Sequence, residues 1–388
     1  MSASHWTRPT PESTPTKLHV YNSLTNQLNE FIPIDSHHVK MYICGPTVYD
    51  SAHLGHARAY ITFDIIRRII QSYFNYSLQY TMNITDVDDK IIVKARRNYL
   101  YQQYIQKHNN DIKHIISECA TAFTQAINSQ QSKITALQHK ITDSTTQSRY
   151  IDEYNNTAAQ ETLKLQQLQH DHDRFQQHIS STESFSLDLI NEICRSVLCE
   201  KLDTEYGDTI TDQSIYRAHA AKYEAEFFDD MKQLNVLPPD TLTRVTEYID
   251  DIIQLVQKII ANGYGYISNG SVYLDTNKYT ADGNKYGVLA PNSVGNTDLI
   301  ADGEGSLTST TTSDKRSIND FVLWKKSKLG EPYWNSPWGN GRPGWHIECF
   351  ANDTRVLTNH GYLFVEQIEH LLSNNIPVQY ACYDVAST

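Results

Sequence analysis

The sequence predicts an α/β fold in which a parallel, doubly wound sheet carries helices on its faces. Residues 39–43 form a short apolar run, residues 56–76 carry apolar side chains at helical spacing, and residues 78–84 form a second apolar run. A strand, a helix and a strand within about 45 residues make a βαβ unit, whose two strands lie parallel. Ligands of such sheets bind at the carboxyl ends of the strands, so the residues that follow each run are candidates for a site.

Composition limits the class of protein. The chain has 388 residues, enough for two or three domains, and its 33 basic and 45 acidic residues give a net charge of −12. This balance argues weakly against a general polyanion binder, although a local basic patch can still bind RNA. The same acidic balance leads us to expect no DNA among the partners. No apolar run approaches the roughly 20 residues of a membrane span, so we expect no membrane either.

The start of the chain and its cysteines indicate a compartment. Residues 1–17 are rich in Ser, Thr and Pro and lack a hydrophobic stretch, so we expect a disordered tail without a secretory signal. The six cysteines follow no disulfide framework spacing. A long chain of this kind is typical of the reducing cytoplasm, where thiols stay available to bind metal.

Residues 98–210 differ in character from the segments on either side. They are rich in Gln and poor in Gly and Pro, and apolar side chains recur at steps of three and four. This pattern predicts a helical hairpin or short coiled coil inserted into the α/β domain, which then comprises residues 18–97 and 211–348. A solvated insertion without chemistry is the simplest interpretation. The two apolar series are Ile134, Leu137, Ile141 and Leu165, Leu168, His172, Phe175, Ile179.

Further elements are expected after the insertion. Pro238-Pro239-Asp240 predicts the start of a helix, since Pro favours the first turn, and Asn262-Gly263 predicts its end. Asn269-Gly270 is a two-residue turn signal, so residues 264–274 are expected to form a β-hairpin. Polar residues 292–318 predict a loop, and residues 321–324 predict another strand.

Chemically active side chains gather behind the first predicted strand. Cys44 follows this strand, and a His53-x-Gly55-His56 pattern opens the helix. A helix N-terminus presents free N–H groups and a partial positive charge, and imidazoles add hydrogen-bond donors, so the pattern suits a phosphate. A thiol is a soft metal ligand. The structural alternatives are two histidines that merely cap a surface helix, and a Cys44 that packs as a small buried apolar residue.

Five motifs in the same order resemble cysteinyl-tRNA synthetase, a class I aminoacyl-tRNA synthetase, over nearly the whole chain before residue 349. The resemblance implies an incomplete Rossmann-like catalytic domain of the class I type. The insertion is similar to that of eukaryotic cytosolic members. The family's His-His-Glu-Asn-Glu motif, its Lys-Met-Ser-Lys-Ser loop and its anticodon-binding domain are absent from these 388 residues. The motifs are Tyr42 to Asp50, His53 to His56, Asn83 to Lys90, Asp320 to Lys325 and Gly341 to Cys349.

The resemblance implies roles around the nucleotide and a metal. His53 and His56 would be catalytic and would stabilise the phosphates of ATP, which binds with Mg²⁺. Gly55 would let the nucleotide approach closely, because it has no Cβ. Cys44 and Cys349 match the two thiolate ligands of the family's Zn²⁺.

The resemblance also implies an amino-acid pocket. Gly45 and Thr85 match residues that contact the substrate L-cysteine, and Trp345 resembles the aromatic wall of the pocket, although core packing would explain this Trp equally well. The substrate's thiolate joins the zinc in this family. Serine offers a hard hydroxyl that leaves the metal poorly satisfied, so rejection of serine needs no editing.

From Cys349 onward the sequence departs from the family and resembles the start of an intein, a Hint fold. Cys349 is followed by Asp353-Thr354, a short strand, a turn at residues 359–361 and a second strand. Cys349 would attack the carbonyl carbon of Glu348 and form a thioester. Residues 349–388 would then be an N-terminal Hint fragment, and the downstream host segment would have to begin with Cys to restore the zinc ligand. A divergent tail with chance similarity is the alternative.

These implications lead to one functional hypothesis and two alternatives. The hypothesis is a cytoplasmic cysteine–tRNA ligase, interrupted by an intein, that uses ATP to convert L-cysteine to cysteinyl adenylate and passes it to tRNA(Cys). The first alternative is a protein-splicing precursor or a truncated, inactive ligase fragment. The second is a cysteine-activating ligase with an acceptor other than tRNA.

Overall fold

The computed structural model describes residues 17–23, 25–33, 37–142, 148–180, 186–284, 286, 307 and 314–347, together with the strands at 355–358 and 361–364. The chain divides into two compact units, each described by itself. Unit 1 comprises residues 1–88, 221–326 and 334–388, and unit 2 comprises residues 89–220 and 327–333. No helix within the described ranges is long and apolar enough to cross a membrane.

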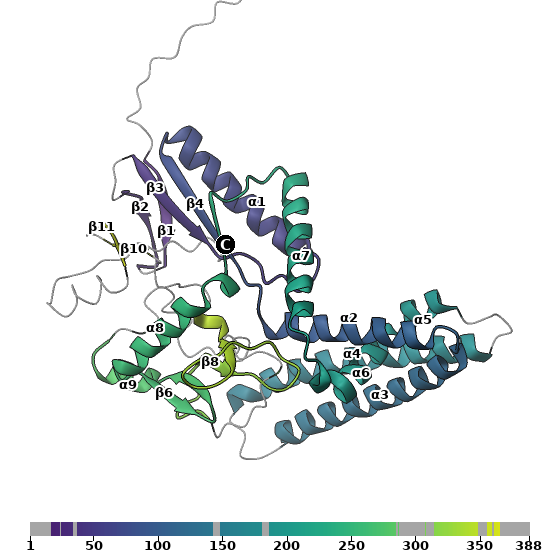
Figure 1. Ribbon diagram of the computed structural model, residues 1–388. Helices are drawn as coiled ribbons and strands as arrows, with labels where there is room; N and C mark the ends of the chain where they lie inside the picture. Colours follow the sequence, from purple (N-terminus) through teal and green to yellow (C-terminus); the bar gives the residue numbers. More distant parts are fainter. Residues whose placement is uncertain are drawn as a thin grey trace, which may run out of the picture. The chain divides into compact units, whose positions relative to one another are not determined.

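Unit 1 contains the expected βαβ arrangement (Figure 1). Strand β3 (His38–Ile43), helix α1 (Leu54–Arg68) and strand β4 (Ser77–Ile84) follow one another, and β3 pairs with β4 in parallel, with Val39 opposite Leu78. A π-helical turn, η1 (Ile69–Tyr73), extends α1. The predicted strand–helix–strand pattern and its parallel pairing are therefore confirmed.

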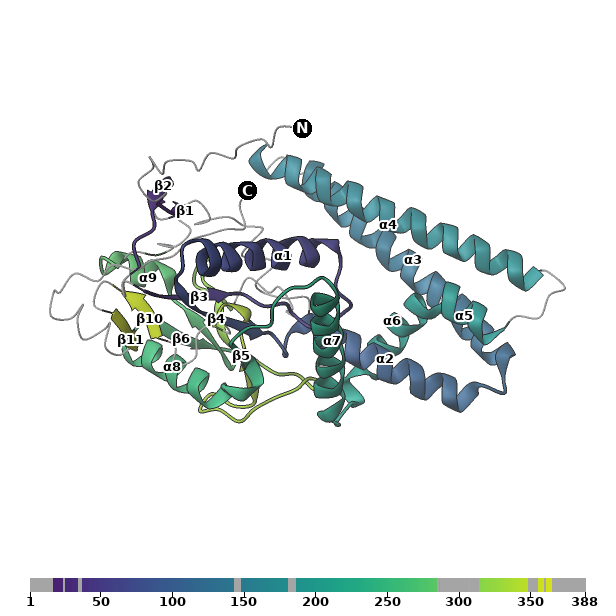
Figure 2. The ribbon, with the colours of Figure 1, turned by 90° about the horizontal axis from the view of Figure 1, so that it is seen from above.

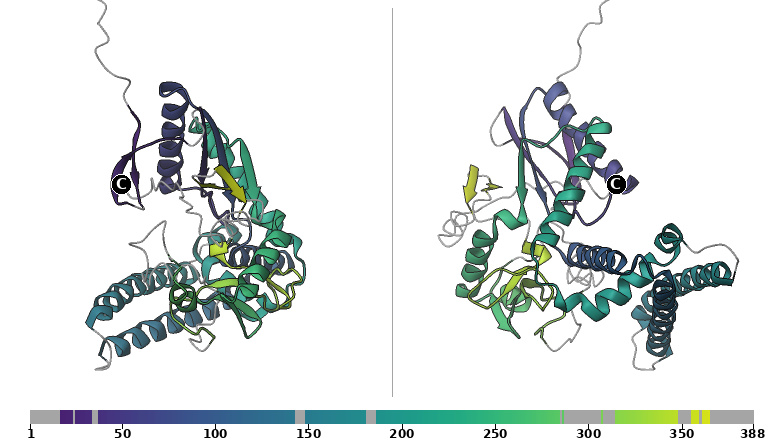
Figure 3. Two further views of the ribbon diagram at one scale, coloured as in Figure 1. Left: turned by 90° about the vertical axis from the view of Figure 1, so that its left-hand side faces the viewer. Right: turned by 45° about the vertical axis from the view of Figure 1, so that its right-hand side comes forward.

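Helices α1 and α7 (Ser214–Gln233) contribute apolar side chains to one cluster with this sheet. Figure 3 shows the ribbons of these elements from two further sides. Tyr60 and Ile70 from α1, Phe227 and Met231 from α7, and Met82 from β4 belong to one buried cluster. The buried side chains that alternate along β4 and those that recur at helical spacing on α1 thus pack in a common core, as the two sequence patterns require.

The expectation of a helix beginning at Pro238-Pro239-Asp240 is wrong. A third strand, β5 (Thr241–Arg244), begins immediately after them and pairs with β4 in parallel, so the sheet order is β3-β4-β5. Asp240 N–H donates to Tyr80 O at 2.8 Å, and the Asp240 carboxylate accepts from Tyr80 N–H at 2.7 Å. These contacts hold the segment extended along β4, and fixed proline φ angles are compatible with an extended chain as well as with a helix start.

The helix comes later, as α8 (Ile249–Ala261), after the short turn η3 (Val245–Glu247). Its predicted end is confirmed, because Gly263 has φ +82°, a conformation that Gly adopts without strain. Ile252 and Val256 on this helix are fully buried.

A second sheet in unit 1 is antiparallel, in the order β6-β7-β8-β9. Asn269 (φ 49°) and Gly270 (φ 84°) form the turn of the predicted hairpin, and the predicted strand at 321–324 is observed one residue later. Most of the predicted loop 292–318 lies outside the described residues. The strands are β6 (Gly265–Ser268), β7 (Ser271–Leu274), β8 (Val322–Lys326) and β9 (Gly341–Pro343), and helix α9 (Thr276–Ala281) follows β7.

Unit 2 is helical, and its two longest helices lie side by side (Figure 2). Among the residues of the two predicted apolar series, Ile134, Leu165 and Phe175 are buried, whereas Ile179 is 40% exposed at the end of its helix. The predicted helical hairpin is confirmed. The elements are α2 (Asp89–His108), α3 (Ile112–Thr142), α4 (Ser148–Ser180), α5 (Leu187–Ile193), α6 (Arg195–Tyr206) and η2 (Gly207–Thr209).

Two short antiparallel ribbons complete the description. Strands β1 (His19–Asn22) and β2 (Gln27–Glu30) pair near the start of the chain. Strands β10 (Arg355–Thr358) and β11 (Gly361–Phe364) pair with Thr358 opposite Gly361, which confirms the strand pair expected around residues 359–361. The expected disordered tail, apart from residue 17, lies outside the described residues.

Candidate active site

The carboxyl ends of β3 and β4 meet at one edge of the parallel sheet, as expected for a ligand site. Cys44 follows β3 and is exposed, so its interpretation as a small buried apolar residue is wrong. The loop after Cys44 is bonded to the residue that follows β4. Thr85 N–H donates to Pro46 O at 3.2 Å, and Val48 N–H donates to Thr85 O at 3.2 Å. The structure thus brings the predicted pocket residue Thr85 next to the loop that carries Cys44.

Asn83, which the sequence analysis assigned no role, organises this loop. It is buried near the end of β4, and its Oδ1 accepts from Gly45 N–H at 2.9 Å and from the Tyr42 hydroxyl at 2.9 Å. A Cβ on residue 45 would lie 1.6 Å from Asn83 O, so only Gly fits there. One indication of this role was present in the sequence, because Asn83 is a polar residue between the apolar residues Met82 and Ile84.

The backbone at Cys44 is held from the helix side as well. The Tyr60 hydroxyl, on α1, donates to Cys44 O at 3.0 Å. Burial is the main cause that raises the pKa of Tyr60 far above its usual range, with smaller contributions from Tyr80 and Cys44. The hydroxyl therefore remains a donor at all physiological pH values and fixes the position of the strand end beneath the thiol.

His53 and His56 form a reciprocal cap at the start of α1. His53 Nδ1 accepts from Gly55 N–H at 3.0 Å, and His56 Nδ1 accepts from His53 N–H at 3.2 Å. The two rings stack with their centroids 4.0 Å apart. Because each Nδ1 acts as an acceptor, a neutral ring carries its proton on Nε2, so both histidines retain one N–H donor beyond the cap.

Burial and the proximity of His53 lower the pKa of His56 below its ordinary value of 6.5. A neutral His56 is the form that the cap requires, since a protonated Nδ1 cannot accept. Gly55 is required by the cap itself, because a Cβ there would lie 2.7 Å from the His53 ring. The sequence analysis expected Gly55 to admit a nucleotide, and in the structure the group that approaches it closely is this ring.

Trp345 lies on a 3-10 turn, η5 (Trp345–Ile347), and is 45% exposed. Gly344 connects this turn to β9, and its N–H donates to Leu323 O at 2.9 Å. A Cβ at residue 344 would lie 2.1 Å from Val322 O, so the chain crosses β8 in close contact. Ile347 and Val87 are buried in one apolar cluster. The turn that carries Trp345 and the segment that follows Thr85 therefore share a core.

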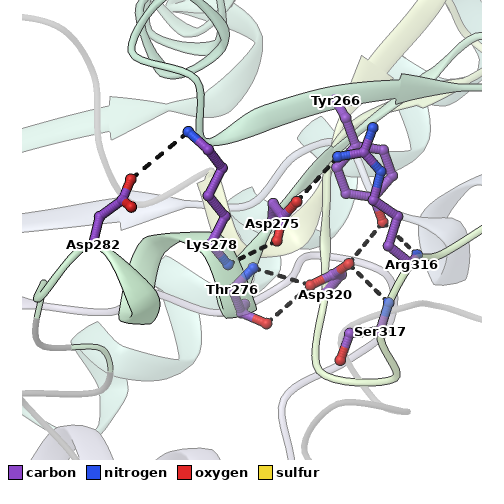
Figure 4. A network of polar contacts seen from close by, with 8 residues as sticks. All are labelled: Tyr266, Asp275, Thr276, Lys278, Asp282, Arg316, Ser317 and Asp320. Carbon is purple, nitrogen blue, oxygen red and sulfur yellow. Dashed lines mark hydrogen bonds and ion pairs between the residues drawn. The ribbon is translucent and has the colours of Figure 1, made fainter.

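A buried carboxylate, Asp320, fixes the segment that precedes β8 (Figure 4). Asp320 is fully buried and accepts from the Tyr266 hydroxyl at 2.8 Å and from Ser317 N–H at 3.0 Å. It also accepts from Thr276 N–H at 3.0 Å and from the Thr276 hydroxyl at 2.9 Å, at the first residue of α9. The sequence analysis placed Asp320 in a motif without giving it a role, and its four donors identify it as a structural anchor.

The metal and splicing predictions rest largely on residues that are not described. Cys44 is exposed and can serve as a ligand, but one thiol is fewer than the three protein ligands that zinc sites normally use. Cys349, the second predicted ligand and the predicted splicing nucleophile, lies outside the described residues. Within the described part of the chain, no group of three or more His, Cys, Asp or Glu residues is placed to hold a metal ion.

Comparisons with known proteins agree with the motifs. The family described as "tRNA synthetases class I (C) catalytic domain" matches residues 30–363. The cytoplasmic cysteine–tRNA ligase of Macaca fascicularis is 43% identical to this chain over 343 residues. The aligned part covers 87% of this chain and 43% of the relative. That of Homo sapiens gives the same identity and coverage, and that of Xenopus tropicalis is 42% identical over 91% of this chain and 45% of the relative. The chain thus spans less than half the length of the curated relatives that it matches.

Proposed function

This chain belongs to the family of class I (C) tRNA synthetase catalytic domains, and we propose that it is part of a cytoplasmic cysteine–tRNA ligase. The ligase would form cysteinyl adenylate from L-cysteine and ATP and transfer the cysteinyl group to tRNA(Cys). The relatives named above carry this activity in their names and match 87–91% of this chain. The structural observation that supports the proposal is the exposed thiol of Cys44 at the end of β3. Nine residues later His53 caps α1, together with His56 in its first turn.

The start of α1 supplies the phosphate-binding part of the proposed mechanism. The first N–H groups of a helix and its dipole favour negative charge, and the His53 and His56 Nε2–H groups can donate to phosphate oxygens. These donors are already fixed by the cap before ATP binds. Donors fixed in advance stabilise charge that develops on the phosphates during attack by the amino-acid carboxylate, because little reorganisation is needed.

The edge of the sheet supplies the amino-acid pocket. We assign Gly45, Thr85 and Trp345 to it, and Cys44 and Cys349 to a zinc ion. When bound, zinc supplies a soft Lewis acid that favours a thiolate over the hydroxyl of serine. The contribution of the protein is to hold the Cys44 backbone through the Tyr60 hydroxyl and to hold the adjoining loop through Asn83 and Thr85.

ATP–pyrophosphate exchange in the complete protein that carries this chain tests the proposal. With zinc and Mg²⁺ present, we expect exchange that depends on L-cysteine and is at least about a hundredfold weaker with L-serine. Cys44→Ser should abolish both the exchange and the bound zinc. Cys199→Ser, which changes a buried thiol in unit 2, is the matched control and should retain both. Absence of cysteine-dependent exchange in the zinc-loaded protein would refute the activity.

A second proposed function is protein splicing that begins at Cys349. The antiparallel pairing of β10 with β11, shortly after Cys349, supports this proposal. The family match continues to residue 363 and overlaps the same strands, so the two interpretations compete for this segment. Peptide mapping of the mature protein decides between them. Splicing predicts a peptide in which Glu348 is joined to a new Cys, whereas a peptide that continues from Glu348 through Cys349 to Arg355 in the mature protein contradicts it.

Two variants of the proposal have distinct outcomes. A truncated ligase fragment would show neither exchange nor a spliced peptide. A cysteine-activating ligase with another acceptor would show the exchange but would not charge tRNA(Cys), so an aminoacylation assay with purified tRNA separates it from the main proposal.

A further inference from the structure

A partly buried carboxylate, Asp86, adjoins the proposed pocket and connects two segments that are distant in sequence. Asp86 directly follows Thr85, and its carboxylate accepts from Thr246 N–H at 3.0 Å and from the Thr246 hydroxyl at 2.5 Å. Thr246 lies in η3, the turn that follows β5. The contact therefore joins segments 160 residues apart, on either side of the helical insertion.

This contact lies beyond the end of the sheet. The β4–β5 ladder ends with Ile84 opposite Arg244, so no strand pairing connects the residues that follow. Asp86 and Thr246, two positions farther along each chain, hold the chains together at that point. On the opposite side, Thr85 is bonded through its backbone to the loop after β3. Thr85 is thus fixed between two contacts, one toward β3 and one toward β5.

Thr246 supplies the two bonds that Asp86 accepts from a distant segment, in addition to a bond from the backbone of Asp86 itself. Arg244 directly precedes η3, but its guanidinium does not serve Asp86. It donates to Glu224 at 2.6 to 3.1 Å and to Glu247 at 3.0 Å. Burial raises the pKa of Asp86, the two bonds from Thr246 oppose this shift, and Glu224 adds to it. Val87 and Val245, which flank the contact, are buried in the same cluster as Ile347.

We propose that Asp86 and Thr246 are positioning residues for the amino-acid site, and that their contact sets the placement of Thr85 against the loop that carries Cys44 and Gly45. The inference rests on the proposed function for its kinetic consequence, but its structural consequence can be measured without any activity. Neither residue touches the substrate in this proposal, and both act through the backbone at Thr85.

The amino end of β5 offers a matched control on the same two strands. Asp240 precedes β5, and its carboxylate accepts from Tyr80 N–H at 2.7 Å and forms an ion pair with Arg67 at 3.2 Å. Asp240 therefore joins the middle of β4 to the amino end of β5 with the same residue type. Loss of Asp240 should lower stability without changing the pocket, because the site lies at the carboxyl ends.

Kinetics provide the first test. In the complete protein, Asp86→Ala and Thr246→Val should each raise KM for L-cysteine about tenfold, with kcat and KM for ATP changed less than about threefold. Asp86→Asn and Thr246→Ser keep groups that can maintain the contact, so they should stay within about threefold of the parent. Asp240→Ala should lower the denaturation midpoint and leave KM for L-cysteine unchanged. An equal rise in KM from Asp86→Ala and Asp240→Ala would overturn the proposal.

Hydrogen exchange provides the second test and does not require an active enzyme. The Thr85 and Val48 amides donate in the bonds that join the two strand ends, so Asp86→Ala and Thr246→Val should accelerate their exchange by at least about tenfold. Asp240→Ala should leave both amides as protected as in the parent. Unchanged protection in Asp86→Ala and Thr246→Val contradicts the positioning role, whether or not the protein activates cysteine.

Discussion

The cysteines of the two units show how position decides the use of one side chain. Cys44, in unit 1, is exposed at a strand end whose backbone is fixed by Tyr60 and adjoins Asn83. Cys119 and Cys194, in unit 2, are fully buried among apolar helix residues. A hydrogen bond with Cys119, together with burial, raises the pKa of Cys194 far above its usual range.

The polar groups of the two units differ in the same way. At the strand ends of unit 1, buried polar groups hold loops that carry exposed side chains. In unit 2, the buried ion pair of Arg96 with Asp203 connects α2 to α6, and Arg96 also donates to Gly330 O, so these contacts join helices to a turn. The comparison teaches that buried hydrogen-bonding side chains support a site only where the loop that they hold keeps other side chains exposed to solvent.

The largest effect is expected from breaking the buried ion pair between Arg96 and Asp203 in unit 2. Arg96 donates to Asp203 at 2.7 and 3.1 Å and to Gly330 O at 3.1 Å, and both charged side chains are about nine-tenths buried. Arg96→Met should lower the free energy of unfolding by about 3 kcal/mol, because Asp203 then stays buried with only Arg97 at 3.7 Å to compensate. Urea denaturation measures this loss.

Arg174→Met is the control for that prediction. Arg174 forms an exposed ion pair with Glu192 at 2.6 Å, so its loss should cost less than about 0.5 kcal/mol. Equal destabilisation by Arg96→Met and Arg174→Met would show that burial of the unit 2 pair contributes nothing.

The second prediction concerns the close contact that the strand-end loop requires. Gly45→Ala should cost about 2 kcal/mol and abolish cysteine-dependent exchange, because the new Cβ would displace the loop from Asn83. Gly283→Ala is the control, since Gly283 has φ +87° and a Cβ there meets nothing within 4 Å. The control should lose stability through backbone strain alone and keep its activity. Retained activity in Gly45→Ala would mean that the loop need not be held in this position.

Much of the fold could be predicted from local patterns. The strand–helix–strand unit followed from apolar periodicity, and Asn269-Gly270 specified a turn that needs positive φ at both residues. Strand β5 was missed because all four of its residues are only partly buried and its pairing depends on β4, a long-range contact that no local pattern reports. Proline at 238 and 239 is compatible with both interpretations, and Asp240 decides between them through its contacts with Tyr80.

The candidate site was predictable only in part. Cys44, His53 and His56 could be proposed because their residue types are chemically distinctive and close in sequence. The groups that hold the site were missed because folding alone brings them together. Asp86 and Thr246 are separated by 160 residues, and neither has a sequence neighbour that signals the other.

The third prediction compares the cysteines directly. Cys119→Ser should cost about 1–3 kcal/mol, because it places a hydroxyl in an apolar core beside Cys194. In the zinc-free protein, Cys44→Ser should change the free energy of unfolding by less than about 0.5 kcal/mol, since its side chain is exposed. Zinc content should follow the opposite order and fall only in Cys44→Ser. Zinc retained by Cys44→Ser would remove Cys44 from the proposed metal site.

The smallest effect is expected from the histidine cap. Because the folded-state pKa of His56 lies below its ordinary value of 6.5, the unfolded chain binds the proton more tightly. The stability that the neutral ring contributes is therefore present above about pH 6.5 and is lost as the pH falls through the folded-state pKa. His56→Gln keeps an acceptor for His53 N–H but does not titrate, so its stability should decline less between these pH values. Thermal unfolding of both proteins across this range measures the difference, and identical pH slopes would show that the cap does not depend on a neutral His56.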